Sequence, residues 1–93
     1  MSASIVESGV PVNITATGNV VVTTDCALIG FYVNSTTNGT LVLKRGGSGG
    51  TAIGGTITPA IGFHPYPANC PGGLHATIAN TLDVTFFVVP GQA

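Results

Sequence analysis

Charged residues are scarce in this 93-residue chain, which has 2 Lys and Arg, 3 Asp and Glu, and a formal net charge of -1. Binding a phosphate backbone requires a dense positive field, so nucleic acid is not an expected partner. Charged residues make up 5% of the chain, against about 25% in a usual globular domain. So few charges predict that copies of the chain or another protein cover much of its surface.

A long apolar run and a targeting segment are also missing. The longest apolar candidate, Phe86–Val89, is far shorter than the roughly 20 residues that span a bilayer, so no membrane partner is expected. The first residues lack the basic and apolar stretches of a secretory signal, which predicts synthesis in a cytosol. In that compartment Cys26 and Cys70 are expected to be small buried thiols, although the sequence leaves their redox state open.

Side chains that could catalyse a reaction or bind a metal are few: Glu7, Asp25, Cys26, His64, Cys70, His75 and Asp83. Catalysis needs at least two such groups held together, and no local motif pairs them. A zinc site would have to use the two cysteines and two histidines, whose spacing lacks the close ligand pairs usual for zinc. The chain is therefore predicted not to be an enzyme and to need no metal or cofactor.

What the chain does contain is β-branched residues: Val, Ile and Thr supply 31 of its 93 residues. These side chains lose rotamer freedom in helices and pack well on sheets. The chain also has 14 Gly and 6 Pro, which divide it into short segments. We therefore expect an all-β fold over residues 1–93, a single domain of about eight short strands arranged as a sandwich or a barrel, with residues 1–9 as an N-terminal arm or a short edge strand.

Turn signals suggest how these strands connect. Val12–Thr17 and Val20–Thr24 flank Gly18 and Asn19, which predicts a hairpin. Asn38-Gly39 and Asn80-Thr81 predict tight turns between further short strands. The segment 61–71 contains three of the six prolines and is predicted to be an extended edge or an irregular loop.

The last predicted strand, 82–89, is apolar on both faces. A strand in a two-layer sandwich buries one face in its own core, so Phe87 and Val89 need a second cover, for which another subunit is the simplest candidate. Phe63 and Tyr66 of the proline-rich segment would pack across the same contact. The sequence therefore predicts an oligomer interface at Phe63, Tyr66, Phe87 and Val89. As an alternative, Tyr32, Phe63 or Tyr66 could stack against a sugar.

Several short runs of residues carry a resemblance to a known class of proteins. They are Phe31-Tyr32-Val33-Asn34, Gly39-Thr40-Leu41-Val42-Leu43, Gly49-Gly50-Thr51-Ala52-Ile53, Gly62-Phe63-His64-Pro65-Tyr66-Pro67, Gly73-Leu74-His75-Ala76-Thr77-Ile78 and Asp83-Val84-Thr85-Phe86-Phe87-Val88. Over roughly residues 26–89 this order resembles small all-β virion proteins of tailed bacteriophages, most similar to the head decoration or capsid cement class.

The resemblance implies a single antiparallel, jelly-roll-like β-sandwich. It also implies a homo-oligomer, a trimer or a dimer, that binds the major capsid protein on the outside of the capsid. Such a protein would be made in the cytoplasm of the bacterial host and located in the virion. Small phage proteins of this kind also serve in collars, tails or fibres. A carbohydrate- or receptor-binding module in one of those places is therefore the alternative function.

Overall fold

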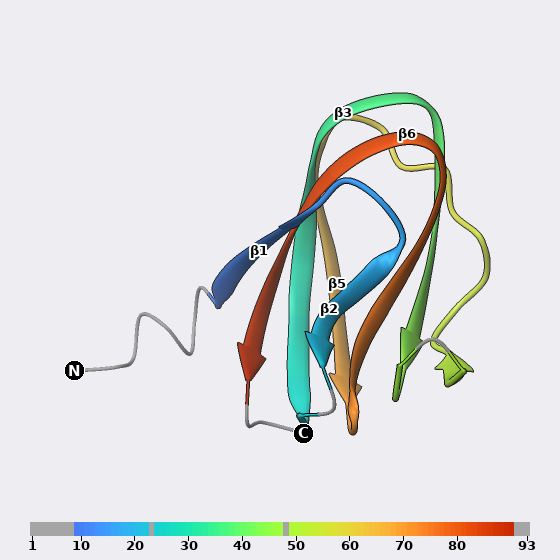
Figure 1. Ribbon diagram of the computed structural model, residues 1–93. Helices are drawn as coiled ribbons and strands as arrows, with labels where there is room; N and C mark the ends of the chain where they lie inside the picture. The colour runs from blue at the N-terminus through green and yellow to red at the C-terminus, as the bar shows by residue number, and fades with distance from the viewer. Residues whose placement is uncertain (1–8, 23, 48, 91–93) are drawn as a thin grey trace.

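The computed structural model describes residues 9–22, 24–47 and 49–90 (Figure 1). These residues form six strands: β1 Val10–Ile14, β2 Gly18–Val22, β3 Cys26–Arg45, β4 Thr51–Ala52, β5 Gly62–Cys70 and β6 Gly73–Pro90. The described part of the chain contains no helix, and therefore none that could cross a membrane. Apart from Gly9, the predicted N-terminal arm lies outside the described residues.

All six strands belong to one antiparallel sheet. Its main path runs in the order β1-β6-β3-β4, while β2 pairs with β6 and β5 pairs with β3. The long strands β3 and β6 pair along almost their whole length, from Cys26 opposite Pro90 to Arg45 opposite Leu74. The predicted all-β fold is therefore confirmed, and the β3–β6 ladder is the longest strand pairing in the described sheet.

Both long strands bend sharply, as Figure 1 shows. Asn38 in β3 and Asn80 in β6 have positive φ angles of 55° and 61°, which asparagine tolerates better than most residues. The Asn80 amide donates a hydrogen bond to the Asn38 carbonyl oxygen at 2.7 Å. Thr37 and Asn38 both lie opposite Thr81, so a bulge accompanies the bend. The two asparagines thus build one corner shared by both strands.

This corner explains why about eight short strands were expected and six are found. Asn38-Gly39 and Asn80-Thr81 were predicted to be turns that end strands. In the structure β3 and β6 pass through them and stay paired on both sides, so each long strand replaces two predicted short ones. Gly39 is required there, because a Cβ would lie 2.5 Å from the Thr81 carbonyl oxygen.

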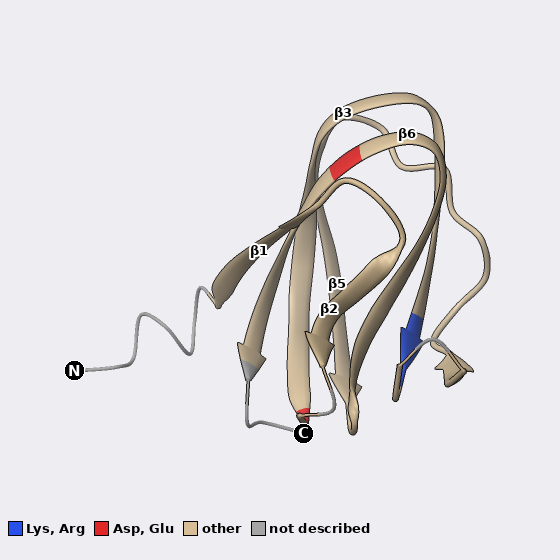
Figure 2. Cartoon of the chain, viewed as in Figure 1, with Lys and Arg blue, Asp and Glu red and all other residues tan. Residues whose placement is uncertain are grey.

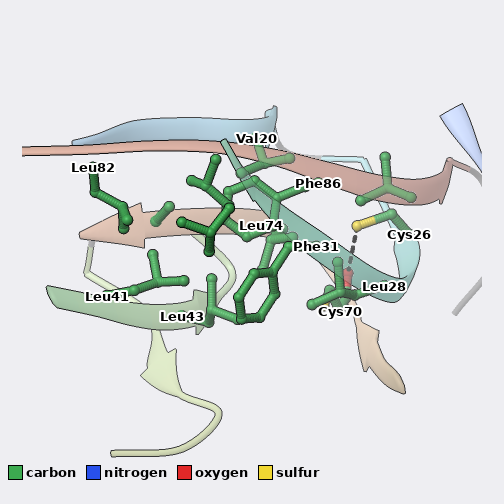
Figure 3. Close-up of a cluster of buried hydrophobic side chains, with 14 residues drawn as sticks. Val20, Cys26, Leu28, Phe31, Leu41, Leu43, Cys70, Leu74, Leu82 and Phe86 are labelled. Atoms are coloured by element: carbon green, nitrogen blue, oxygen red, sulfur yellow. Dashed lines mark hydrogen bonds between the residues drawn. The ribbon is translucent and has the colours of Figure 1, made fainter. Parts of the chain in front are cut away.

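The corner divides the sheet into two arms. The first arm contains β1, β5, the beginning of β3 and the end of β6, whereas the second contains β2, β4 and the remaining halves of β3 and β6. One apolar cluster draws residues from both arms (Figure 3), including Phe31 and Phe86 from the first and Leu43 and Leu74 from the second. The folded sheet therefore encloses its core between its own two halves.

One local prediction was wrong, and another left two alternatives, of which the extended edge is confirmed. The predicted hairpin between Val12–Thr17 and Val20–Thr24 does not form, because β1 and β2 each pair with β6, one on each arm. The proline-rich segment forms a strand, β5, which pairs with β3 at the edge of the first arm. An edge position is where a strand can carry prolines, because one side of its backbone needs no partner.

Candidate functional site

The outer face of the first arm carries exposed aromatic side chains. Cross-strand pairing builds two rows of residues on this face. One row contains Pro11, Phe87, Gly30 and Pro65, and the other contains Asn13, Thr85, Tyr32 and Phe63. Tyr32 is 42% exposed and Phe63 is 50% exposed, whereas Phe31 and Phe86 on the opposite face are buried. We call the surface formed by Tyr32, Phe63 and Phe87 the aromatic face.

A glycine allows the aromatic face to form. The ring centroids of Phe63 and Phe87 lie 6.1 Å apart with the rings tilted by 58°. Gly30 occupies the strand between them, and a Cβ at this position would lie 2.9 Å from Phe63 Cζ and 2.6 Å from the His64 carbonyl oxygen. The rings therefore meet over a position that has no side chain, in an arrangement favourable to aromatic pairs.

A polar cluster borders the aromatic face near the corner. Asp83 Oδ1 accepts hydrogen bonds from the amides of Asn13 at 2.7 Å and Asn34 at 3.2 Å, and both amides also donate to Thr85 Oγ1. Among the described residues Asp83, red on β6 in Figure 2, is the only Asp, Glu, Lys or Arg within the strands of the first arm, because Asp25 comes just before β3. The one carboxylate beside the aromatic face thus already has two donors.

The structure brings together two of the four predicted interface residues. Phe63 and Phe87 pack against each other on the aromatic face. Val89 lies opposite Ala27 and is only 8% exposed. Tyr66 lies on the other face of β5, where its ring centroid is 6.1 Å from that of Phe31. The sugar-stacking set of Tyr32, Phe63 and Tyr66 is divided in the same way, between two faces.

Sequence reasoning did not identify the polar cluster or the place of Tyr32 beside Phe63. Asn13, Asn34 and Asp83 come from three strands, and only the register of those strands brings their side chains together. Tyr32 lies directly opposite Phe63, again through long-range pairing. The alternation of Phe31, Tyr32 and Val33 was the one local signal, since it places Tyr32 on the face opposite the core.

A pocket of about 440 Å³ lies at the edge of the first arm, where β5 faces the segment 57–60. Phe31, His64 and Tyr66 supply its aromatic lining. His64 Nε2 lies 2.7 Å from the Ala60 carbonyl oxygen, which can only accept, so Nε2 donates. All eight residues that line the pocket carry no formal charge, so it suits an uncharged, partly apolar group.

The histidines and cysteines that were weighed for catalysis or zinc lie in separate places. His64 is in the pocket of the first arm, whereas His75 is on β6 in the second arm, with Nδ1 2.9 Å from Asn19 Oδ1. Burial lowers the pKa of His75, and the positive charge of Lys44 lowers it further. Within the described residues no three His, Cys, Asp or Glu side chains gather as a metal site would require.

Cys26 and Cys70 are both free thiols with no exposed surface. They are direct cross-strand partners on β3 and β5. Burial raises the pKa of the Cys26 thiol to about 12, and the neighbouring Cys70 and Asp25 contribute to that rise. Burial also raises the pKa of Cys70. Thiols held in their protonated form are poor nucleophiles, so this pair does not resemble a catalytic cysteine site.

Comparisons with protein-family models, with curated proteins and with solved structures found no match to this chain.

Proposed function

We propose that this chain is a structural virion protein of a tailed bacteriophage that oligomerises and decorates or cements the capsid shell. The observation that carries the proposal is the aromatic face, where Tyr32 and Phe63 remain about half exposed beside Phe87. We also assign the folded sheet to the jelly-roll-like β-sandwiches, in which two sheet layers enclose one core.

The composition of the aromatic face supports a role in protein contacts. Exposed aromatic side chains are enriched in the centres of protein interfaces, which are surrounded by polar rims. Here the rim is the cluster of Asn13, Asn34, Asp83 and Thr85. Because Asp83 Oδ1 already accepts two hydrogen bonds, covering this oxygen with a partner would not leave it without a donor.

The proposed partners are further copies of the chain, as a homodimer or a homotrimer, and the major capsid protein. A standard interface buries roughly 800 Å² on each partner. Repeating such a contact at every lattice site would multiply its effect without requiring any one residue to bind strongly. The protein would then act at the virion surface by burying area, and it would perform no chemistry.

The test compares particles of the encoding phage made with and without this protein. We expect particles that lack it to rupture at a lower temperature, and added wild-type protein to restore the higher one. Phe63→Asp should fail to restore it, because a charge would replace the exposed ring of the aromatic face. Val22→Asp is the matched control, since Val22 is also exposed but lies on β2 in the second arm. Equal rupture temperatures with and without the protein would refute a cementing role.

A second candidate function is a carbohydrate- or receptor-binding module of a collar, tail or fibre. The pocket formed by Phe31, His64 and Tyr66 favours it, because aromatic walls and a phenol hydroxyl are common in sugar sites. A glycan array with the isolated protein separates the two functions. Glycan binding that Tyr66→Phe weakens would support the second, whereas capsid binding without any glycan signal would support the first.

A further inference from the structure

We infer that Cys26 and Cys70 are an oxidation site whose two sulfurs close into a disulfide that joins β3 to the edge strand β5. The two residues lie directly opposite each other in the antiparallel register. Residues in such positions have Cα atoms about 4.5–5.5 Å apart. That separation falls within the range of about 4.4–6.8 Å found for disulfides, so the backbone is already placed for the bond.

The side chains of the two cysteines also share one site. Both are fully buried in the apolar core cluster. The Cys26 thiol donates to the Cys70 carbonyl oxygen over 3.8 Å, the contact drawn as a dashed line in Figure 3. The Cys70 thiol donates to the Ala68 carbonyl oxygen over 3.8 Å. Rotation of the two side chains, without any change of register, would bring the sulfurs together.

The position of the pair gives an oxidant a route to it. Cys26 is the first residue of β3, and Cys70 is the last residue of β5. Strand ends open more readily than strand centres, so fraying of one short stretch would expose both thiols. Because the pKa of each thiol is raised in the closed state, reaction would proceed through this opening and would be slow.

The reaction needs a small-molecule disulfide such as oxidised glutathione. One cysteine thiolate attacks it, forming a mixed disulfide and releasing one glutathione thiolate. The second cysteine thiolate then attacks the protein sulfur of the mixed disulfide and expels the other glutathione thiolate. The protein loses two electrons and two protons, and the oxidant becomes two molecules of the reduced thiol.

The disulfide would reinforce an edge strand of the first arm. In the described sheet β5 pairs only with β3, across a register shift between Leu28 and Gly30. Pro65 and Pro67 have no N–H to donate to any partner. A covalent bond at the end of this ladder would hold β5, and Phe63 with it, against β3. The inference concerns the isolated chain and does not depend on the proposed function.

The experiment incubates the full chain under native conditions with oxidised glutathione and follows it by peptide mapping and thermal unfolding. We expect a Cys26–Cys70 cross-link within one chain and a mass lower by two hydrogens. The melting temperature should rise by on the order of 10 °C and return when a dithiol reductant is added. Cys26→Ala and Cys70→Ala, oxidised in parallel, should show no such rise.

Three results would overturn the inference. The first is that both thiols stay reduced in the native chain under conditions in which the urea-unfolded chain becomes oxidised. The second is that covalent dimers or glutathione adducts accumulate in place of the internal bond. The third is an internal bond that lowers the melting temperature, which would show that the native register does not accommodate it.

Discussion

The rings of Phe63 and Phe87 touch, with centroids 6.1 Å apart, although β3 runs between their two strands. The contact is diagonal, because Phe63 lies opposite Tyr32 and Phe87 lies opposite Gly30. It exists because Gly30 has no side chain to separate the rings. The aromatic face is thus a product of three strands, and its centre depends on one glycine.

Phe63→Asp should abolish self-association while leaving the chain folded. Phe63 is half exposed, so the fold loses little, whereas an oligomer would have to bury an unpaired carboxylate. Static light scattering should report the monomer mass for this variant and a larger mass for the wild type. Val22→Asp, on the second arm, should keep the wild-type mass. An unchanged mass for folded Phe63→Asp would place the interface elsewhere.

Gly30→Ala should destabilise the fold by about 1–3 kcal/mol, the usual cost of overpacking. The added Cβ would lie 2.6 Å from the His64 carbonyl oxygen and 2.9 Å from the Phe63 ring. Urea unfolding measures the change. Gly55→Ala is the control, because a Cβ there meets no atom within 4 Å. Equal stability of the two variants would contradict the packing described for Gly30.

Asn80→Ala should destabilise the corner by about 2 kcal/mol, since it loses a hydrogen bond and places alanine in the left-handed region. Asn80→Gly loses the same hydrogen bond but accepts the positive φ, so its loss should be about 1 kcal/mol. Thermal or urea unfolding of both variants gives the comparison. A glycine variant less stable than the alanine variant would show that the positive φ angle at position 80 does not account for the instability of Asn80→Ala.

Stability should fall as the pH decreases below about 6.5, and His75 should cause part of that fall. Burial, and then Lys44, lower the pKa of His75 in the folded chain below its ordinary value of 6.5. The unfolded chain therefore binds a proton first, and protonation favours unfolding until the pH falls below the folded pKa. His75→Gln should flatten this part of the urea-unfolding profile, whereas His64→Gln should leave the contribution of His75 in place. An unaltered slope in His75→Gln would exclude the mechanism.

The sequence predicted the class of fold but not the course of its long strands. Alternation and β-branched residues were sufficient to predict an all-β chain. Asn38 and Asn80 were also recognised as parts of turn signals, and both have positive φ angles in the structure. Whether such a residue ends a strand or bends it depends on the partner strand, which here bends at the same place. Pairing between distant segments decides that choice, and local turn chemistry does not.

The candidate site could be predicted only in part, because pairing between distant segments also decides which of its side chains meet. A strand that is apolar on both faces needs a second cover, and this argument identified Phe87 from its own segment alone. Tyr66 was grouped with Phe63 because the proline-rich segment was not expected to extend a β-ladder, which would leave both rings free to pack across one contact. In a strand, residues three apart lie on opposite faces, and β5 places these two accordingly. The pairing of Cys26 with Cys70 depends on register and had no local signal.

The ladder between β3 and β6 also determines how the chain can fold. Its closest pair along the chain is Arg45 with Leu74, and its most distant is Cys26 with Pro90. Every pair must therefore close a long loop, which contains β4 and β5. Such non-local contacts slow folding, because loop-closure entropy is lost before the contacts form. We therefore expect folding on the millisecond to second timescale. The aromatic face includes the pairing of Phe87 with Gly30, so newly made chains would form this ladder before they could associate through that face.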